Sequence, residues 1–311
     1  MRVLVPRYSG FCPGVKQAEK RIFDAKRRTD SGSLFVLGDL IHNRKYIKYL
    51  EEGGVRTVEE PDEIPEGAVT VIRTHGVPRD MEKVLRDRFD VLDLTCSKVK
   101  KLQRLIKEHS GQGSFIVIAG KKSHPEVQGL VSYARESLVI ETEADLAGLG
   151  DRNGVFQNRL RKGNCSRVIV VSQTTGSREL YEKTVESLKA LALESREPEL
   201  ALEIESVDTI CPVISLRETA ALETQKCVNV TFVVGDRLSS NANRLYRRLR
   251  ASDPGTHFVQ GLDELKALEL PLGTCAAAQV VSSSSTPDFI TRQIVHYLEN
   301  IEGTGTAKVK Q

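Results

Sequence analysis

One loose pattern occurs three times along this chain, and it restricts what the chain can fold into. Each copy begins with a cysteine, continues through an amphipathic helical stretch, and reaches an apolar strand that ends in glycine 24 to 26 residues later. A second apolar strand follows in every copy. The cysteines are Cys12, Cys96 and Cys211, and the strand glycines are Gly38, Gly120 and Gly235. The repeat predicts three similar units that carry one thiol each.

The order of strands and helices predicts the fold class. Apolar runs such as FVLGDLI, FIVIAG and VTFVVG alternate with stretches of helical periodicity. This alternation is typical of βαβ units with largely parallel sheets. We therefore predict an α/β protein built from three small α/β domains related by a pseudo-threefold axis. The expected boundaries are 1–94, 95–206 and 207–301, with the opening strand RVLVPR in the first domain and a disordered tail over 302–311.

Composition excludes several classes of protein. The net charge of +3 is weak, Trp is absent and aromatic residues make up 5 % of the chain, so nothing indicates a nucleic-acid surface. No apolar run is long enough to span a membrane, and the chain begins as a strand without a signal peptide. Six scattered cysteines among 311 residues are typical of cytoplasmic thiols.

Polar residues stand where the strands of each copy end. In open α/β sheets, ligands bind beyond the carboxyl ends of the strands. Imidazoles, hydroxyls and amides next to helix N-termini suit an anion, although Ser, Thr and Asn also cap helices without any ligand. The candidate binding residues are His42, His75, His124, Thr174, Thr175, Ser239, Ser240, Asn241, Ser283, Ser284, Ser285 and Thr286.

The three repeat cysteines differ from the other three. Cys12, Cys96 and Cys211 each follow a strand and precede a helix, where backbone N–H groups favour a thiolate. Three thiolates can hold a multi-iron cluster with one metal position left open, and a zinc site is the main alternative. We interpret the remaining cysteines as small buried residues: Cys165 in an aperiodic surface segment over 151–167, Cys227 on a helix and Cys275 in a strand.

Glu126 follows His124 by two residues, at the start of an expected helix. A carboxylate there often does no more than interact with the helix dipole. In a closed pocket beside a metal it could instead carry a proton, because burial raises the pKa of a carboxyl group.

Several motifs in order along the chain resemble one known family, the 4-hydroxy-3-methylbut-2-enyl diphosphate reductases of the non-mevalonate isoprenoid pathway. The motifs are FCPGV, HNR, THGVP, DLTC, HPEV, SQTT, DTIC, SSNANRL and STP. They cover nearly the whole chain. The resemblance implies three α/β domains around a central [4Fe–4S] cluster held by Cys12, Cys96 and Cys211.

The resemblance also implies roles for the other candidate residues. The substrate diphosphate would be bound by His42, His75, His124, Ser239, Ser240, Asn241 and Ser285. Thr174 would position the substrate hydroxyl, with Glu126 relaying a proton. The alcohol would bind the unique iron, and loss of water would yield isopentenyl or dimethylallyl diphosphate. A ferredoxin or flavodoxin would donate the electrons, and the family pattern leaves open whether the protein is a monomer or a homodimer.

The chain departs from the family pattern at a few positions near these motifs. They are Asp39, Ser97, the Pro212-Val213-Ile214 run, Leu238 and the Ser283-Ser284 pair. None removes a cysteine or Glu126, but they affect the expected rate, product ratio and substrate. Three alternatives therefore stay open at this point: an iron–sulfur electron carrier or redox sensor, a paralogue acting on another phosphorylated allylic substrate, and a binding protein with structural cysteines.

Overall fold

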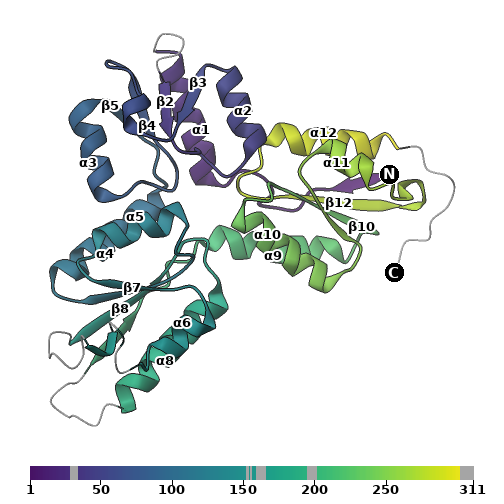
Figure 1. Cartoon of the computed structure of the whole chain (residues 1–311). Coiled ribbons are helices and arrows are strands. Elements are labelled where there is room, and N and C mark those ends of the chain that lie inside the picture. Colours follow the sequence, from purple (N-terminus) through teal and green to yellow (C-terminus); the bar gives the residue numbers. More distant parts are fainter. Residues whose placement is uncertain (29–33, 152–153, 155, 159–165, 195–201, 302–311) are drawn as a thin grey trace. The chain divides into compact units, whose positions relative to one another are not determined.

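Three four-stranded parallel sheets form the framework of the chain in a computed structural model, as Figure 1 shows. The structure describes residues 1–28, 34–151, 154, 156–158, 166–194 and 202–301. The predicted α/β class with three parallel sheets is confirmed. The expected tail over 302–311 and Cys165 lie outside the described residues.

The first sheet has the strand order β3-β2-β4-β5. Its strands are β2 (Leu34–Leu37), β3 (Val55–Val58), β4 (Val69–Ile72) and β5 (Asp90–Asp93). The helices of this stretch are α1 (Pro13–Lys26), α2 (Arg44–Glu52) and α3 (Arg79–Arg88). β2 pairs in parallel with both β3 and β4, and all four of its residues are buried.

The second sheet has the order β7-β6-β8-β9. Its strands are β6 (Phe115–Ala119), β7 (Ser137–Ile140), β8 (Arg167–Ser172) and β9 (Glu203–Ser206). The helices of this stretch are α4 (Ser97–Gly111), α5 (Pro125–Tyr133), α6 (Glu143–Gly148) and α8 (Arg178–Glu194). The apolar run FIVIA becomes the central strand β6 because both of its faces are covered. Ile116 and Ile118 pack with Leu102 of α4, whereas Phe115 and Val117 pack with Leu188 of α8.

The third sheet has the order β1-β12-β10-β11. Its strands are β1 (Arg2–Leu4), β10 (Val230–Val234), β11 (Thr256–Val259) and β12 (Ala277–Ser282). The helices of this stretch are α9 (Pro212–Gln225), α10 (Ser240–Ser252), α11 (Leu262–Ala267) and α12 (Asp288–Glu299). The opening strand, expected in the first domain, pairs in parallel with β12 of the third sheet, where Arg2 lies opposite Ala277. The two ends of the chain thus share one sheet.

Glycine ends the central strand of each sheet because a side chain would not fit there. A Cβ at Gly235, after β10, would lie 2.5 Å from the Cβ of Ala242 in α10. A Cβ at Gly120, after β6, would lie 2.8 Å from the Cβ of Gln173. Both distances are shorter than real Cβ contacts, so Ala242 and Gln173 can pack against these strand ends only because glycine stands there. The repeat seen in the sequence is therefore a packing requirement at the strand ends.

Two expectations about buried positions are wrong. Phe156, inside the segment expected to be a surface excursion, is 2 % exposed, and its ring centroid lies 5.6 Å from that of Phe115. Cys227 lies beyond the end of α9 and is exposed, because the helix stops at Gln225. Cys275 is half-buried and packs against the core of the third sheet.

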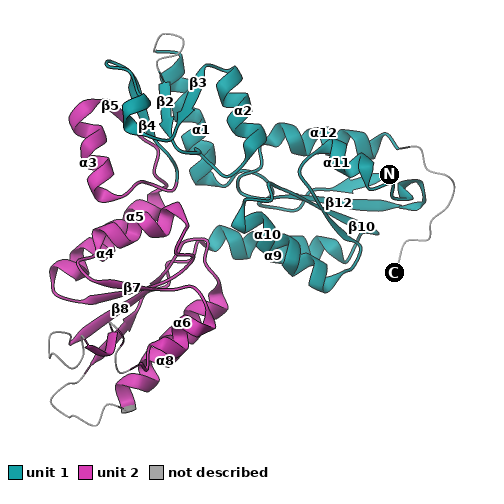
Figure 2. Cartoon of the chain, viewed as in Figure 1, with its two compact units in different colours: residues 1–74, 212–311 teal, residues 75–211 magenta. Residues whose placement is uncertain are grey.

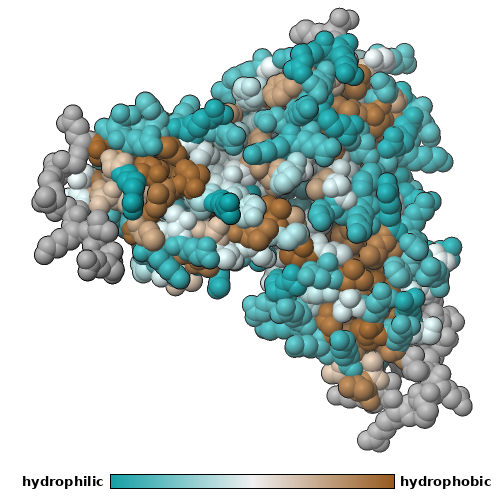
Figure 3. All heavy atoms as spheres, turned by 180° about the vertical axis from the view of Figure 1, so that it is seen from behind, coloured by the Kyte–Doolittle hydropathy of each residue, from teal (hydrophilic) through white to brown (hydrophobic). Residues whose placement is uncertain are grey.

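The chain divides into two compact units, coloured separately in Figure 2. Unit 1 comprises residues 1–74 and 212–311, and unit 2 comprises residues 75–211. On the face drawn in Figure 3, polar side chains cover much of the surface, with patches of apolar residues between them. Among the described residues no helix is both long and apolar enough to cross a membrane. The three domain boundaries expected from the repeat stay a prediction.

Candidate active site

A buried carboxyl group lies at the start of α5 in unit 2. Pro125 occupies the first position of the helix, and His124 precedes it as the N-cap. The backbone N–H of Glu126 donates to Nδ1 of His124 at 3.1 Å, which orients the imidazole. Glu126 itself is 1 % exposed. A residue that normally interacts with the dipole at a solvated helix end is here enclosed by protein.

Thr174 holds both oxygens of this carboxyl group. It lies just beyond β8, and its backbone N–H donates to Oε1 of Glu126 at 2.6 Å. Its hydroxyl donates to Oε2 at 2.8 Å. Thr174 is buried as well, so water competes little for these hydrogen bonds. The sequence pointed to both residues, but not to their direct contact.

Burial changes the acidity of Glu126. Removal of the carboxyl group from water raises its pKa from 4.5 to about 7, even though the hydrogen bonds from Thr174 act in the opposite direction. Both protonation states are therefore populated near neutral pH. A carboxyl group with this pKa can give a proton to a bound substrate and recover it from water.

Two of the expected histidines lie together in unit 2. The rings of His75 and His124 meet edge to face with centroids 5.3 Å apart. His75 is half-buried, and His124 is 7 % exposed. Because Nδ1 of His124 accepts from the backbone of Glu126, the proton of a neutral ring is on its other nitrogen, which is the one that can donate. This end of unit 2 thus combines imidazole donors with a titratable carboxyl group.

The segment before Cys211 is fixed to the end of β8. The backbone N–H of Cys211 donates to the carbonyl oxygen of Thr174 at 2.8 Å. Two residues earlier, the hydroxyl of Thr209 accepts from the backbone of Ser172 at 2.8 Å and donates to its carbonyl at 2.5 Å. Thr174 therefore positions Glu126 with its hydroxyl and amide, and Cys211 with its carbonyl.

Cys96 and Cys12 each precede a helix, in unit 2 and unit 1 respectively. Cys96 is the N-cap of α4, and the backbone just before it is held by Asp93, whose carboxylate accepts from the N–H of Thr95 at 2.9 Å. Cys12 is the N-cap of α1, whose first residue is Pro13. Neither thiol is in a disulfide bond within the described residues, and both are half-buried, as is that of Cys211.

Arg217 on α9 is a residue that sequence reasoning missed. Its side chain is 1 % exposed, and its guanidinium donates to the carbonyls of Tyr8 at 2.6 Å and Gly10 at 2.8 Å. These carbonyls belong to the loop that leads to Cys12. An arginine in a helix usually indicates a solvated face, so no sequence signal marked this one as buried.

Unit 1 carries a network of hydroxyl groups at the ends of β10 and β12. Ser239 caps α10, its hydroxyl accepting from Ala242 at 3.3 Å, and it receives a hydrogen bond from Ser285 at 3.2 Å. Ser283 lies 3.2 Å from Ser285, and Asn241 donates to Ser284 at 2.5 Å. We call this group the hydroxyl network: Ser239, Asn241, Ser283, Ser284, Ser285 and Thr286.

The remaining candidates of unit 1 lie close to these elements in the chain. His42 is half-buried and precedes Asn43, the N-cap of α2, whose side chain accepts from Tyr46 at 3.0 Å. Ser240 is exposed at the first position of α10. Asp236, which the sequence did not single out, is buried and accepts from the backbone of Arg44 at 2.9 Å.

Parallel α/β sheets, polar groups at their strand ends and a buried titratable carboxyl define an α/β enzyme with a small-molecule site. The model of the LytB protein family matches residues 3–299, so the chain belongs to this family. This finding confirms the resemblance inferred from the motifs.

Relatives that span the full chain carry one name. A 4-hydroxy-3-methylbut-2-enyl diphosphate reductase of Clostridioides difficile is 33 % identical over 307 residues, 97 % of this chain and 100 % of that protein. One of a Geobacter species is 32 % identical over 310 residues, 97 % of this chain and 98 % of that protein. These relatives, like others at about 30 % identity, are named as enzymes that reduce this diphosphate.

Solved structures agree with the fold. A structure of (E)-4-hydroxy-3-methyl-but-2-enyl diphosphate reductase, described as the terminal enzyme of the non-mevalonate pathway, superposes with a TM-score of 0.72 at 28 % identity. The match covers 97 % of this chain and 100 % of that one. A reductase structure from Plasmodium falciparum gives a TM-score of 0.78 over 100 % of this chain and 94 % of its own, and at 22 % identity it supports the fold alone.

Proposed function

We propose that this chain catalyses the reductive dehydroxylation of (E)-4-hydroxy-3-methylbut-2-enyl diphosphate to isopentenyl and dimethylallyl diphosphate. The reaction consumes two electrons and two protons, breaks the allylic C–O bond and releases water. The names of the full-length relatives support this assignment. The observation that carries it is the buried pair of Glu126 and Thr174, because hydroxide leaves poorly unless a proton reaches it.

In this proposal Glu126 protonates the departing oxygen. Its pKa of about 7 keeps a population of protonated carboxyl at neutral pH. Thr174 positions the hydroxyl of the substrate, because its own hydroxyl already lies 2.8 Å from Oε2 of Glu126. One proton leaves with the water, and the second is added to carbon at either end of the allylic system, which accounts for two products.

The anionic end of the substrate is assigned to the imidazoles and the hydroxyl network. The proposed diphosphate ligands are His42, His75, His124, Ser239, Ser240, Asn241 and Ser285. Neutral donors fixed by helix starts hold a phosphate without a buried positive charge. Binding energy from this end would orient the allylic alcohol toward the proton donor.

We further propose that Cys12, Cys96 and Cys211 hold a [4Fe–4S] cluster. The donor chemistry fits, because the three thiols are outside any disulfide of the described residues, are partly accessible and each stand directly before a helix. When bound, such a cluster supplies electrons and a Lewis-acidic iron that no thiolate covers. Because none of the described cysteines is in a disulfide bond, we also propose a reducing, cytoplasmic setting.

Electron paramagnetic resonance tests this function directly. The protein is purified without oxygen and reduced, and spectra are recorded with and without the hydroxymethylbutenyl diphosphate. We expect a cluster signal that changes when substrate is added, together with formation of both products under dithionite and methyl viologen. A signal that does not change when substrate is added would indicate a carrier, a sensor or a paralogue with another substrate. A protein that takes up no iron and sulfide would be a binding protein with structural cysteines.

A further inference from the structure

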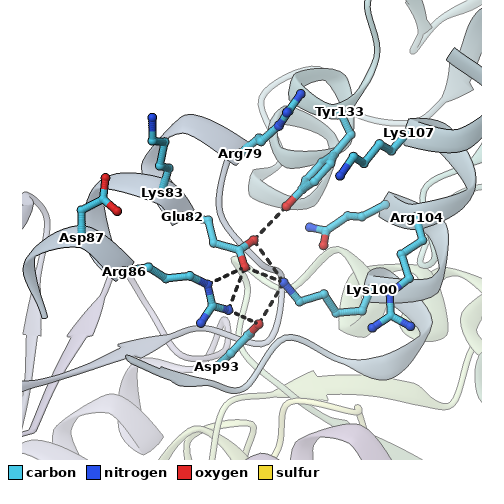
Figure 4. Close-up of a pocket in the computed structure, with 11 residues that line it drawn as sticks. Arg79, Glu82, Lys83, Arg86, Asp87, Asp93, Lys100, Arg104, Lys107 and Tyr133 are labelled. Atoms are coloured by element: carbon cyan, nitrogen blue, oxygen red, sulfur yellow. Dashed lines mark hydrogen bonds and ion pairs between the residues drawn. The ribbon is translucent and has the colours of Figure 1, made fainter. Parts of the chain in front are cut away.

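A basic patch covers α3 and α4 in unit 2. Its cations follow the same helical spacing on both elements, i, i+4 and i+7, which places each set on one face of its helix. We call these residues the α3–α4 patch: Arg79, Lys83 and Arg86 on α3, and Lys100, Arg104 and Lys107 on α4. They line an open hollow of about 590 Å³ (Figure 4).

The centre of the hollow is held together by ion pairs. Glu82 accepts from Nη2 of Arg86 at 2.8 Å, from Nζ of Lys100 at 3.1 Å and from the hydroxyl of Tyr133 at 2.8 Å. Asp93 lies 2.9 Å from Lys100. Figure 4 shows Glu82 between the two helices, linked to these partners. Two carboxylates thus neutralise Arg86 and Lys100 and fix α3 against α4.

The outer cations of the patch are not neutralised. Arg79, Lys83, Arg104 and Lys107 are exposed, and none forms an ion pair with any residue that the structure describes. Six cations and three carboxylates line the hollow, which leaves a net charge of +3. The whole chain has the same net charge of +3. The lining of this hollow alone thus carries as much excess positive charge as the chain as a whole, although other parts of the chain carry cations too.

The arrangement suits an extended acidic surface better than a small anion. Seven residues of helix span about 10 Å, so each row of cations is too long to converge on one phosphate. The two cations that do converge, Arg86 and Lys100, are already bound to Glu82. A single-stranded nucleic acid would also need several stacking surfaces, and the lining of the hollow contains one aromatic ring, that of Tyr133.

The patch is continuous with an element that carries a proposed cluster ligand. α4 begins directly after Cys96, and Lys100, Arg104 and Lys107 follow it on one helix. The helical rise places Lys100 about 6 Å and Lys107 about 17 Å from Cys96 along the axis. Asp93, which fixes the segment before Cys96, also pairs with Lys100 of the patch. A molecule that docks here lies on the scaffold of Cys96.

We propose that the α3–α4 patch is the docking surface for the acidic face of a small one-electron carrier protein. The inference rests on the proposed reductase function, which requires two electrons per turnover from outside the chain. Two reduced carriers each lose one electron, and the substrate gains both along with two protons. Opposite charges on the two surfaces accelerate the encounter and make it sensitive to salt.

The test compares two charge-reversal variants with the same change in net charge. The patch variant carries K83E, R104E and K107E, and the control carries K226E, R247E and R248E, which are exposed positions in unit 1. Binding of an acidic flavodoxin and of an acidic plant-type ferredoxin is measured by calorimetry at several salt concentrations. Activity is measured with each carrier and, separately, with dithionite and methyl viologen, which need no docking surface. Thermal unfolding checks that both variants fold.

We expect the patch variant to bind the acidic carrier at least about tenfold more weakly at low salt and to lose most of the salt dependence. Its carrier-driven rate should fall by about 10- to 100-fold, with the viologen-driven rate unchanged. The control should retain binding and both rates. The proposal would be overturned if the patch and control variants lost carrier binding equally, or if neither lost it. Tighter binding of a single-stranded DNA oligonucleotide than of either carrier would overturn it as well.

The binding measurement separates this inference from the proposed function. If wild-type protein shows no viologen-driven turnover, the reductase assignment fails whatever the variants do. If wild-type protein turns over substrate but the patch variant binds the carrier as tightly as wild type, the proposed docking surface is wrong and the reductase assignment stands.

Discussion

The buried pair in unit 2 and the hydroxyl network in unit 1 use the same scaffold for different chemistry. Both lie where parallel strands end and a helix begins, and both are held by N-cap residues, His124 and Ser239. The unit 2 site contains a carboxyl group with a pKa of about 7. The hydroxyl network contains no ionisable side chain. One buried carboxyl is therefore the chemical difference between them: the unit 2 site can exchange a proton, whereas the hydroxyl network offers only neutral donors and acceptors.

The largest expected effect is on turnover by E126Q. The amide keeps the shape of the side chain but cannot donate an acidic proton, so we expect kcat to fall by about 10²- to 10⁴-fold with little change in KM. Steady-state kinetics with dithionite and methyl viologen measures this. E143Q on α6 is the matched control, because Glu143 is exposed in the same unit, and it should behave like wild type.

We also expect the reduced E126Q protein to give the same electron paramagnetic resonance spectrum as the reduced wild type. An unchanged electron paramagnetic resonance signal together with lost turnover would place the defect in proton transfer. Retention of normal kcat in E126Q would remove the distinction between the two sites, since neither would then supply a proton.

The second effect concerns how the two units hold their cysteine segments. Unit 2 fixes Cys211 through a backbone hydrogen bond to Thr174, whereas unit 1 fixes the loop before Cys12 through the side chain of Arg217. R217M leaves the carbonyls of Tyr8 and Gly10 without their charged donor. We expect a loss of about 4 kcal/mol in the free energy of unfolding, measured with urea.

R217K is the matched comparison for this loss. Lysine restores one charged donor, so it should recover part of the lost free energy of unfolding. Equal stability of R217M and wild type would show that the loop before Cys12 is held by other contacts.

A third effect is a pH dependence of stability that arises from Glu126 in unit 2. Below pH 4.5 Glu126 is protonated in both the folded and the unfolded chain. As pH rises, the unfolded chain loses this proton near 4.5 while the folded chain keeps it to about 7. The stabilisation present at low pH is thus lost progressively between these values, by about 3 kcal/mol in total.

Urea unfolding at pH 5 and pH 8 measures this dependence as the difference between wild type and E126Q. Taking the difference removes the contributions of groups that titrate equally in both proteins. A difference that does not vary with pH would mean that Glu126 titrates normally in the folded chain.

Much of the fold could be predicted from the sequence because its signals are local. The apolar run FIVIA and the periodic stretch after Cys96 became β6 and α4 nearly as expected. The sheet to which each strand belongs was harder to predict, because the pairing of Arg2 with Ala277 joins residues far apart in the chain. The burial of Phe156 was missed for a related reason, since a single aromatic residue in an aperiodic segment has no pattern to mark it.

The candidate site was predictable in its residues and less so in its contacts. Glu126 and Thr174 were singled out because each stands at a strand end or helix start. Their direct hydrogen bonds depend on how β8 and α5 pack, which no local spacing specifies. Arg217 was missed because its carbonyl partners lie about two hundred residues away in the chain.

The smallest expected effect is on substrate affinity in unit 1. Ser285 is 9 % exposed and connects Ser239 to Ser283 within the hydroxyl network. S285A removes one neutral donor from the proposed diphosphate site, so we expect KM to rise about tenfold, with kcat changed much less than in E126Q. Calorimetry with inorganic diphosphate measures the same loss without turnover. S215A, an exposed serine on α9, should change neither quantity. If S285A instead lowered kcat as strongly as E126Q at unchanged KM, the hydroxyl network would take part in the chemistry, and the division between a proton-transfer site and an anion-binding site would be wrong.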